Sequence, residues 1–62
     1  MGSIYVFTIH WGICEEGDIR SWTSIDSVVA GCRESAEQLM LHRIMESPSI
    51  NYFDRFELTD IY

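Results

Sequence analysis

The chain contains no lysine, and its four arginines are outnumbered by ten carboxylates, so that the net charge is −6. Nucleic acids and anionic membranes are bound through basic groups, and this imbalance therefore argues against direct binding to either. The same imbalance favours binding to a basic surface of another protein, including a surface that normally holds nucleic acid. A simpler interpretation, in which the charge only keeps a small domain soluble, stays open.

Cysteine is scarce as well, and long apolar runs are missing. Cys14 and Cys32 are the only two cysteines, whereas a secreted domain of this size usually carries four or more. The first residues, MGSIYVFTIHW, lack the basic start and the long apolar stretch of a signal peptide, and no run approaches the roughly 18 residues of a membrane span. We therefore expect a cytoplasmic protein with reduced, mostly buried cysteines.

The length of 62 residues allows one small domain, which we expect to span residues 1–62. A chain this short buries only about 60% of its unfolded surface, so its small core leaves only a narrow margin of stability. Hydrophobic residues nevertheless make up 47% of the chain, which is more than a disordered segment carries.

Residues 3 to 13, SIYVFTIHWGI, alternate between two faces and are rich in β-branched and aromatic side chains, which predicts a strand. One face is entirely apolar, and we expect its Trp11 to fill the space between the sheet and a helix, near Leu39 and Met40. The other face begins apolar too, which favours a central place in the sheet. Gly17 suits a tight turn, after which DIRSWT returns as a short second strand.

The apolar period changes at Ser24. Apolar residues then follow steps of three and four, which predicts one long helix capped by Thr23 or Ser24. Its apolar positions are Ile25, Val28, Val29, Cys32, Ala36, Leu39, Met40 and Ile44. The adjacency of Val28 and Val29 argues against a strand over residues 25 to 30. Gly31 marks a break or kink, and Pro48 ends the helix.

The tail, INYFDRFELTDIY, predicts a third strand. Tyr52, Phe56 and Leu58 share one face, and the residues assigned to the other face are Phe53, Arg55, Glu57 and Ile61. The fold class that follows is α+β: a small β-β-α-β domain in which an antiparallel three-stranded sheet carries one long helix packed on one face. The first strand should lie in the middle, with the third antiparallel beside it.

No pattern in the chain indicates reaction chemistry. A zinc site would have to use both histidines and both cysteines, but Cys32 and His42 are ten residues apart on the predicted helix, a rise of about 15 Å. The carboxylates around Gly17 lack the spacing of a calcium loop. No nucleophile signature and no phosphate-cradling glycine motif occurs. We therefore expect no enzyme, no metal site and no cofactor.

Two features predict a partner surface instead. Carboxylates are spread over several faces, where they can imitate the spacing of phosphates for a DNA-binding protein. A helix on one face of the sheet also leaves the other face showing apolar groups, and contiguous apolar patches mark interaction surfaces. That open face is predicted to carry Ile4, Val6, Phe53 and Ile61, with His10 and Arg55 beside them. Leu41 and Met45 lie outside the main apolar stripe of the helix.

The candidate partner-binding residues are Glu15, Glu16, Asp18, Phe53, Arg55, Glu57 and Asp60. The expected partner is another protein with a basic surface, with no direct contact to nucleic acid or membrane. The alternative is a structural protein, a homodimer or a larger homo-oligomer, whose apolar sheet face is buried in assembly.

With its small size, its acidity and its β-β-α-β order, the chain resembles small phage proteins that disable host machinery, namely inhibitors of bacterial RNA polymerase and several anti-CRISPR proteins. The resemblance covers the architecture and no sequence motif, since SVVAGCRESAEQL is a generic amphipathic helix. It implies a stoichiometric inhibitor without cofactor that blocks a basic surface of a host complex, in the host cytoplasm if the chain is phage-encoded.

Overall fold

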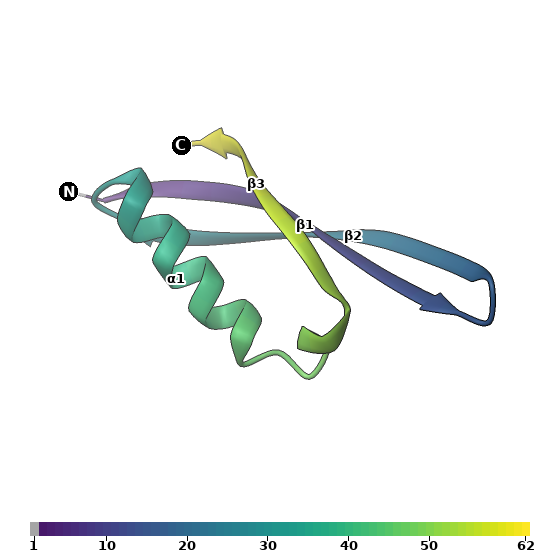
Figure 1. Cartoon of the computed structure of the whole chain (residues 1–62). Coiled ribbons are helices and arrows are strands. Elements are labelled where there is room, and N and C mark those ends of the chain that lie inside the picture. Colours follow the sequence, from purple (N-terminus) through teal and green to yellow (C-terminus); the bar gives the residue numbers. More distant parts are fainter. Residues whose placement is uncertain (1) are drawn as a thin grey trace.

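The computed structural model describes residues 2–62 and confirms the predicted α+β fold and its element order (Figure 1). Three antiparallel strands, β1 (Ser3–Glu15), β2 (Asp18–Ala30) and β3 (Phe53–Ile61), form one sheet in the order β2-β1-β3. The helix α1 (Arg33–Met45) lies on one face of this sheet, and a 3-10 turn, η1 (Ile50–Tyr52), leads into β3. The first strand is central, as its two apolar faces predicted.

The core lies between α1 and one face of the sheet. Alternate residues of β1 point toward the helix, because successive side chains of a strand leave on opposite faces. The buried residues are Tyr5, Phe7, Ile9, Trp11, Val28, Ala30, Ala36, Met40 and Ile44. Phe7 and Met40 are completely inaccessible to solvent. Burying a side chain of this size contributes about 1.5–3 kcal/mol, so these few residues supply most of the hydrophobic stabilisation.

The helix is shorter than predicted, and the prediction of a helix beginning at Ser24 or Ile25 is wrong. Residues 18 to 30 form one strand paired with β1 along its whole length. The adjacent valines do not exclude a strand, because Val28 is buried under the helix and Val29 is 66% exposed on the opposite face. The local spacing of the apolar residues fits both the period of a helix and the period of a strand, and pairing with the apolar central strand β1 selects the strand. Gly31 lies in the bend before α1, and Cys32 is the N-cap.

Strand β3 contains two β-bulges, which change the faces predicted for its side chains. Its register against β1 shifts between His10 and Trp11 and again between Val6 and Phe7. Each shift inserts one extra residue and breaks the alternation of faces. Phe53 is therefore opposite Trp11 and Ile61 is opposite Tyr5, both on the helix side of the sheet. The assignment of Phe53 and Ile61 to the open face is wrong for this reason.

The β1–β2 hairpin extends beyond the rest of the fold (Figure 1). Pairing of β1 with β3 ends at Trp11, whereas pairing with β2 continues to Glu15 and Asp18. We call the two-stranded part, residues 12 to 21, the hairpin arm. It makes the molecule 48 Å long and 20 Å by 14 Å across, with a radius of gyration of 13.0 Å. A compact chain of this length would have a radius of gyration of about 11 Å.

The turn of the arm has positive φ at both central residues, 48° at Glu16 and 85° at Gly17. This is the pattern of a type I′ turn, whose twist matches the twist of the two strands that it joins. The glycine at the second position adopts this geometry without strain, whereas glutamate does not. The turn predicted around Gly17 is confirmed, and its second strand is much longer than expected.

Candidate interaction surface

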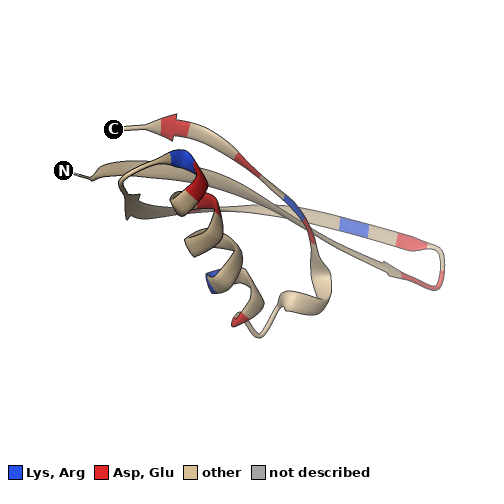
Figure 2. Ribbon diagram, turned by 60° about the vertical axis from the view of Figure 1, so that its left-hand side comes forward, with Lys and Arg blue, Asp and Glu red and all other residues tan. Residues whose placement is uncertain are grey.

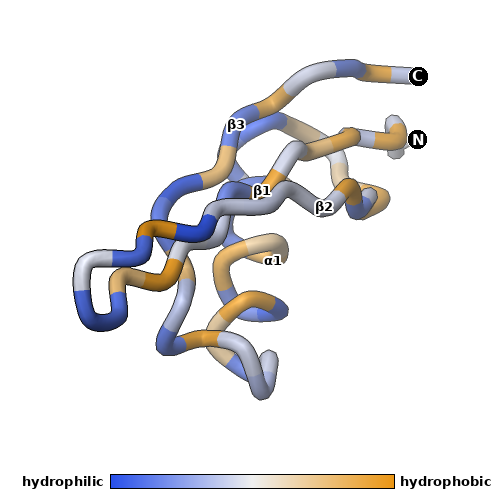
Figure 3. The backbone as a smooth tube through the Cα atoms, turned by 90° about the vertical axis from the view of Figure 1, so that its right-hand side faces the viewer, coloured by the Kyte–Doolittle hydropathy of each residue, from blue (hydrophilic) through white to orange (hydrophobic). Residues whose placement is uncertain are grey.

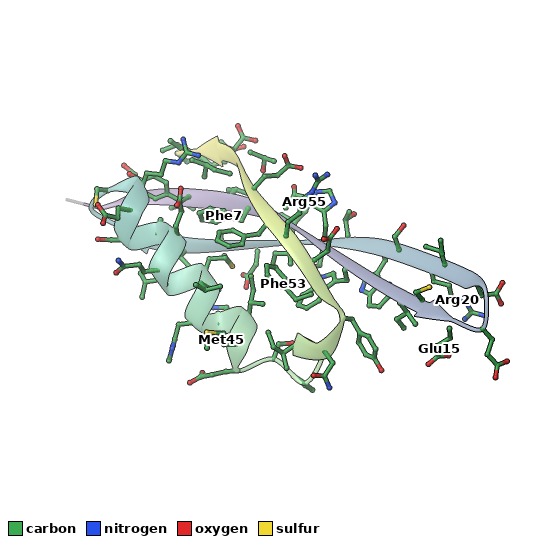
Figure 4. All side chains as sticks on the ribbon, viewed as in Figure 1. Phe7, Glu15, Arg20, Met45, Phe53 and Arg55 are labelled. Atoms are coloured by element: carbon green, nitrogen blue, oxygen red, sulfur yellow. The ribbon has the colours of Figure 1, made fainter. Side chains whose placement is uncertain are left out.

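The acidic turn residues predicted as partner-binding gather at the end of the arm. Glu15, Glu16 and Asp18 are all exposed, and they form a negative tip (Figure 2). Within residues 2–62, none of the three forms an ion pair. Glu15 and Arg20 lie at the end of the molecule far from the helix (Figure 4). The tip therefore presents concentrated charge without nearby protein on most sides.

The predicted residues of β3 form a second group on the open face of the sheet. Arg55, Glu57 and Asp60 are opposite His10, Thr8 and Val6, whose side chains leave β1 away from the helix. The His10 Nε2 atom lies 2.7 Å from the Glu57 Oε1 atom. This hydrogen bond is the main reason that the pKa of Glu57 falls below its ordinary value, and the charges of His10 and Arg55 act in the same direction.

Phe53 belongs to neither group, because it is half-buried on the helix side. Its ring centroid lies 6.0 Å from that of Trp11, in an edge-on arrangement. Figure 4 shows Phe53 among the side chains between β3 and α1. The predicted site is thus divided into an acidic tip and a charged patch on β3, and Phe53 contributes to the core instead.

The open face also carries apolar residues that the sequence interpretation missed. Ile19 is 81% exposed and Ile25 is 75% exposed, and both lie on the face away from the helix, as does Val29. Figure 3 shows apolar positions recurring along the β1–β2 hairpin. The available signal was the alternation that places residues 19, 25 and 29 on one face of a strand. The predicted helix over residues 24 to 44 concealed it for Ile25 and Val29, and the predicted strand DIRSWT was not assigned its faces at Ile19. Ile4 lies on this face as predicted, and Val6 is half-buried there.

The helix also exposes apolar groups. Leu41 and Met45 are exposed as predicted. Leu39 is 48% exposed, so it does not fill the space beside Trp11, although Met40 is buried in the core as expected. Trp11 itself is 7% exposed, which confirms its predicted place in the core under the helix.

Both cysteines are free thiols, and both are exposed, so the prediction that they are buried is wrong. Cys14 lies on the arm, where only two strands are present to cover it. Cys32 lies at the start of α1, with its Sγ atom 3.4 Å from the Ser35 Oγ atom. Hydrogen bonds from the Ser35 side chain, and then from backbone groups of Ser35 and Glu34, lower the pKa of the Cys32 thiol.

Residues 2–62 contain neither a metal-ligand cluster nor a membrane-spanning helix. In that part of the chain, no three His, Cys, Asp or Glu side chains come together in a way that could hold a metal ion. The helix found there is also too short and too polar to cross a membrane.

The structure therefore defines a small α+β protein with a projecting acidic hairpin and a mixed apolar and charged open sheet face. Comparison of the chain with protein-family models, with curated proteins and with solved structures finds no match.

Proposed function

We propose that this chain is a protein-binding module whose hairpin arm docks onto a basic surface of another protein. The observation that carries the proposal is the position of three unpaired carboxylates at the end of an arm that projects beyond the core. Exposed charges of one sign steer association toward a surface of opposite sign. Ile19 on the arm and Ile25 beyond its base then supply apolar area that can be buried in the complex.

The charge of the tip supports a partner that normally holds nucleic acid. A two-stranded β-ribbon has the width of a DNA major groove, but the negative tip would be repelled by phosphates. A basic groove of a nucleic-acid-binding protein has the opposite charge. An arm that occupied such a groove would exclude the nucleic acid and act as a stoichiometric inhibitor, as phage proteins directed against host machinery do.

A cytoplasmic location is part of the proposal, in the host cytoplasm if the chain is phage-encoded. Two exposed free thiols are typical of a reducing compartment. The alternative, burial of the whole open face in an assembly, has less support, because Arg55, Glu57 and Asp60 occupy the β3 side of that face. Burying these charges would require matching partners for each.

The test is capture of the partner from a lysate of the source organism, followed by binding measurements with the purified partner. The tip variant combines Glu15→Gln, Glu16→Gln and Asp18→Asn. The control neutralises two carboxylates of α1 and the one at its C-cap, Glu34→Gln, Glu37→Gln and Glu46→Gln, of which Glu37 and Glu46 are exposed ion-pair partners of Arg33 and His42. Each triple variant removes three negative charges from the net charge of −6, so both reach −3.

We expect the tip variant to associate at least tenfold more slowly at low salt, with the control close to wild type. Rising salt should reduce association of the wild type and affect the tip variant less. Equal rates for the two variants would show that only net charge matters and that the arm is not the docking element.

A further inference from the structure

The outer edge of β2 lacks several of the features that normally protect an edge strand, and its charged residues are confined to Asp18, Arg20 and Asp26. It pairs with β1 without a bulge over residues 18–30, and it contains neither proline nor lysine. Natural edge strands use bulges, charges, proline or short length to avoid pairing with another chain. The opposite edge of the sheet, β3, has two bulges in nine residues. The β2 edge is therefore the more open of the two to an added strand.

The backbone groups that point outward from β2 follow from the hydrogen bonds of β1. The N–H and C=O groups of Ile4 both bond to Tyr62, so even-numbered residues of β1 face β3. Odd-numbered residues of β1 then face β2, and they lie opposite even-numbered residues such as Val28. The odd-numbered residues of β2 consequently direct their N–H and C=O groups away from the sheet.

One of these outward positions is already occupied. The Arg43 Nη1 atom donates to the Ser27 carbonyl at 2.9 Å, and the Ser27 N–H donates to the Asp26 Oδ1 atom at 2.8 Å. Arg43 also bonds to Asp26 at 2.9 Å, which fixes the three groups together. The edge is closed at Ser27, and the open segment consists of Ile19, Ser21, Thr23 and Ile25.

We propose that this open segment pairs with the same segment of a second copy of the chain, antiparallel and about a two-fold axis at Trp22. The two copies then match Ile19 with Ile25 and Ser21 with Thr23, each pair twice. All four open positions of each edge are used, and the ladder stops where Ser27 is occupied. Apolar and Ser–Thr pairs across strands are both favourable.

Neighbouring registers are poorer. Moving the axis to Thr23 would place Ile19 opposite Ser27, whose N–H and C=O groups are already bonded within the chain. Moving the axis to Ser21 would place Ile25 opposite Gly17, which has no side chain to pair with it. The axis at Trp22 is the one that joins the two isoleucines, which have the highest exposed fractions among the large hydrophobic residues of 2–62.

At each end of the ladder Asp18 of one copy lies opposite Asp26 of the other, and Arg43, which already bonds to Asp26, must offset the repulsion between these two carboxylates. Beyond the ladder, the turn glycine of one copy would lie opposite Ser27 of the other, which brings Glu16 and Asp18 beside the Arg43 of that other copy. Arg43 then lies between Asp26 of its own chain and the acidic turn of the second chain. Pairing also gives each two-stranded arm two further strands, and an isolated hairpin is at most marginally stable in water.

The first measurement is the molar mass of the full chain by light scattering and sedimentation over a range of concentrations. We expect a monomer–dimer equilibrium. Thr23→Pro removes an outward N–H without removing a bond to β1, and it should raise the dissociation constant at least about tenfold while the circular dichroism spectrum stays unchanged. A wild-type chain that stays monomeric at millimolar concentration overturns the proposal.

A second measurement tests the register and does not depend on the proline variant. In a chain with Cys14→Ser and Cys32→Ser, Trp22→Cys places two thiols at the two-fold axis, within reach of a disulfide. Arg20→Cys is the matched control on the same face, because the two copies of that position would be about 13 Å apart along the ladder. We expect rapid cross-linking of the first variant only. Equal cross-linking of both variants would exclude this register.

This dimer does not rest on the proposed function, since it is measured on the purified chain alone. If it forms, the acidic tip of each arm is engaged beside Arg43, and a basic partner must compete with the second copy.

Discussion

The Trp11 indole donates a hydrogen bond from its Nε1 atom to the Ser24 Oγ atom, 2.8 Å away. The two residues lie on adjacent strands, on the face that α1 covers. The bond satisfies the one polar group of a ring that is otherwise buried in the core. Ser24 therefore orients a core side chain, whereas its spacing in the sequence suggested a helix cap.

Trp11→Ala should cost about 3–5 kcal/mol of the free energy of unfolding, enough to unfold most of this small domain. The matched control is Trp22→Ala, which removes the same side chain from a position that is 40% exposed. Because the Trp22 ring contacts Tyr52, we expect Trp22→Ala to lower the free energy of unfolding by about 1 kcal/mol. Urea unfolding followed by circular dichroism measures both. A Trp11→Ala chain with near-wild-type stability would show that the core is assigned to the wrong face.

Glu16→Asn should stabilise the hairpin by about 0.5–1 kcal/mol, because asparagine adopts positive φ more readily than glutamate. The φ angle of Glu16 is 48°. Glu15→Asn makes the same change of charge one residue earlier, within β1, where asparagine is unfavourable. The thermal midpoint should rise for the first variant and fall slightly for the second. A rise in both would mean that loss of negative charge, and not turn geometry, is responsible.

The His10–Glu57 pair should stabilise the fold above the unfolded pKa of glutamate, about 4.3, because the pKa of Glu57 is lowered in the folded chain. This contribution is lost as the pH falls through the folded pKa. Carboxyl carbon chemical shifts from an NMR titration report that midpoint directly. In His10→Val it should move upward, whereas His42→Val, which removes the partner of Glu46, should leave it in place. An unchanged midpoint in His10→Val would contradict the assigned cause.

In the wild-type chain Cys32 should begin to react with iodoacetamide at a lower pH than it does in the Ser35→Ala variant. The reason is that the Ser35 hydroxyl is the main group that lowers the pKa of the Cys32 thiol. In Ser35→Ala the pH–rate profile of Cys32 should shift upward. The rate at Cys14 serves as the internal reference, and Ser47→Ala is the control for loss of a hydroxyl elsewhere. If the profile of Cys32 is the same in both variants, Ser35 does not stabilise the thiolate.

Much of the architecture followed from the sequence. Strict alternation in residues 3 to 13 predicted a central strand, and Trp11 was correctly placed on its buried face. These predictions succeeded because the apolar face of a strand must meet a core whatever the rest of the chain does. The acidic turn was also predictable, since a glycine among carboxylates between two strands leaves few alternatives.

Tertiary structure decided the rest. Residues 25 to 30 fit a helix and a strand almost equally well, and pairing with β1 selected the strand. The faces of Phe53 and Ile61 depended on two bulges in β3, which no local pattern indicates. The open and closed parts of the β2 edge depended on Arg43, which reaches Ser27 from a helix sixteen residues further along the chain. Local spacing alone thus determined which residues are buried in β1, while long-range contacts determined which surface remains for a partner.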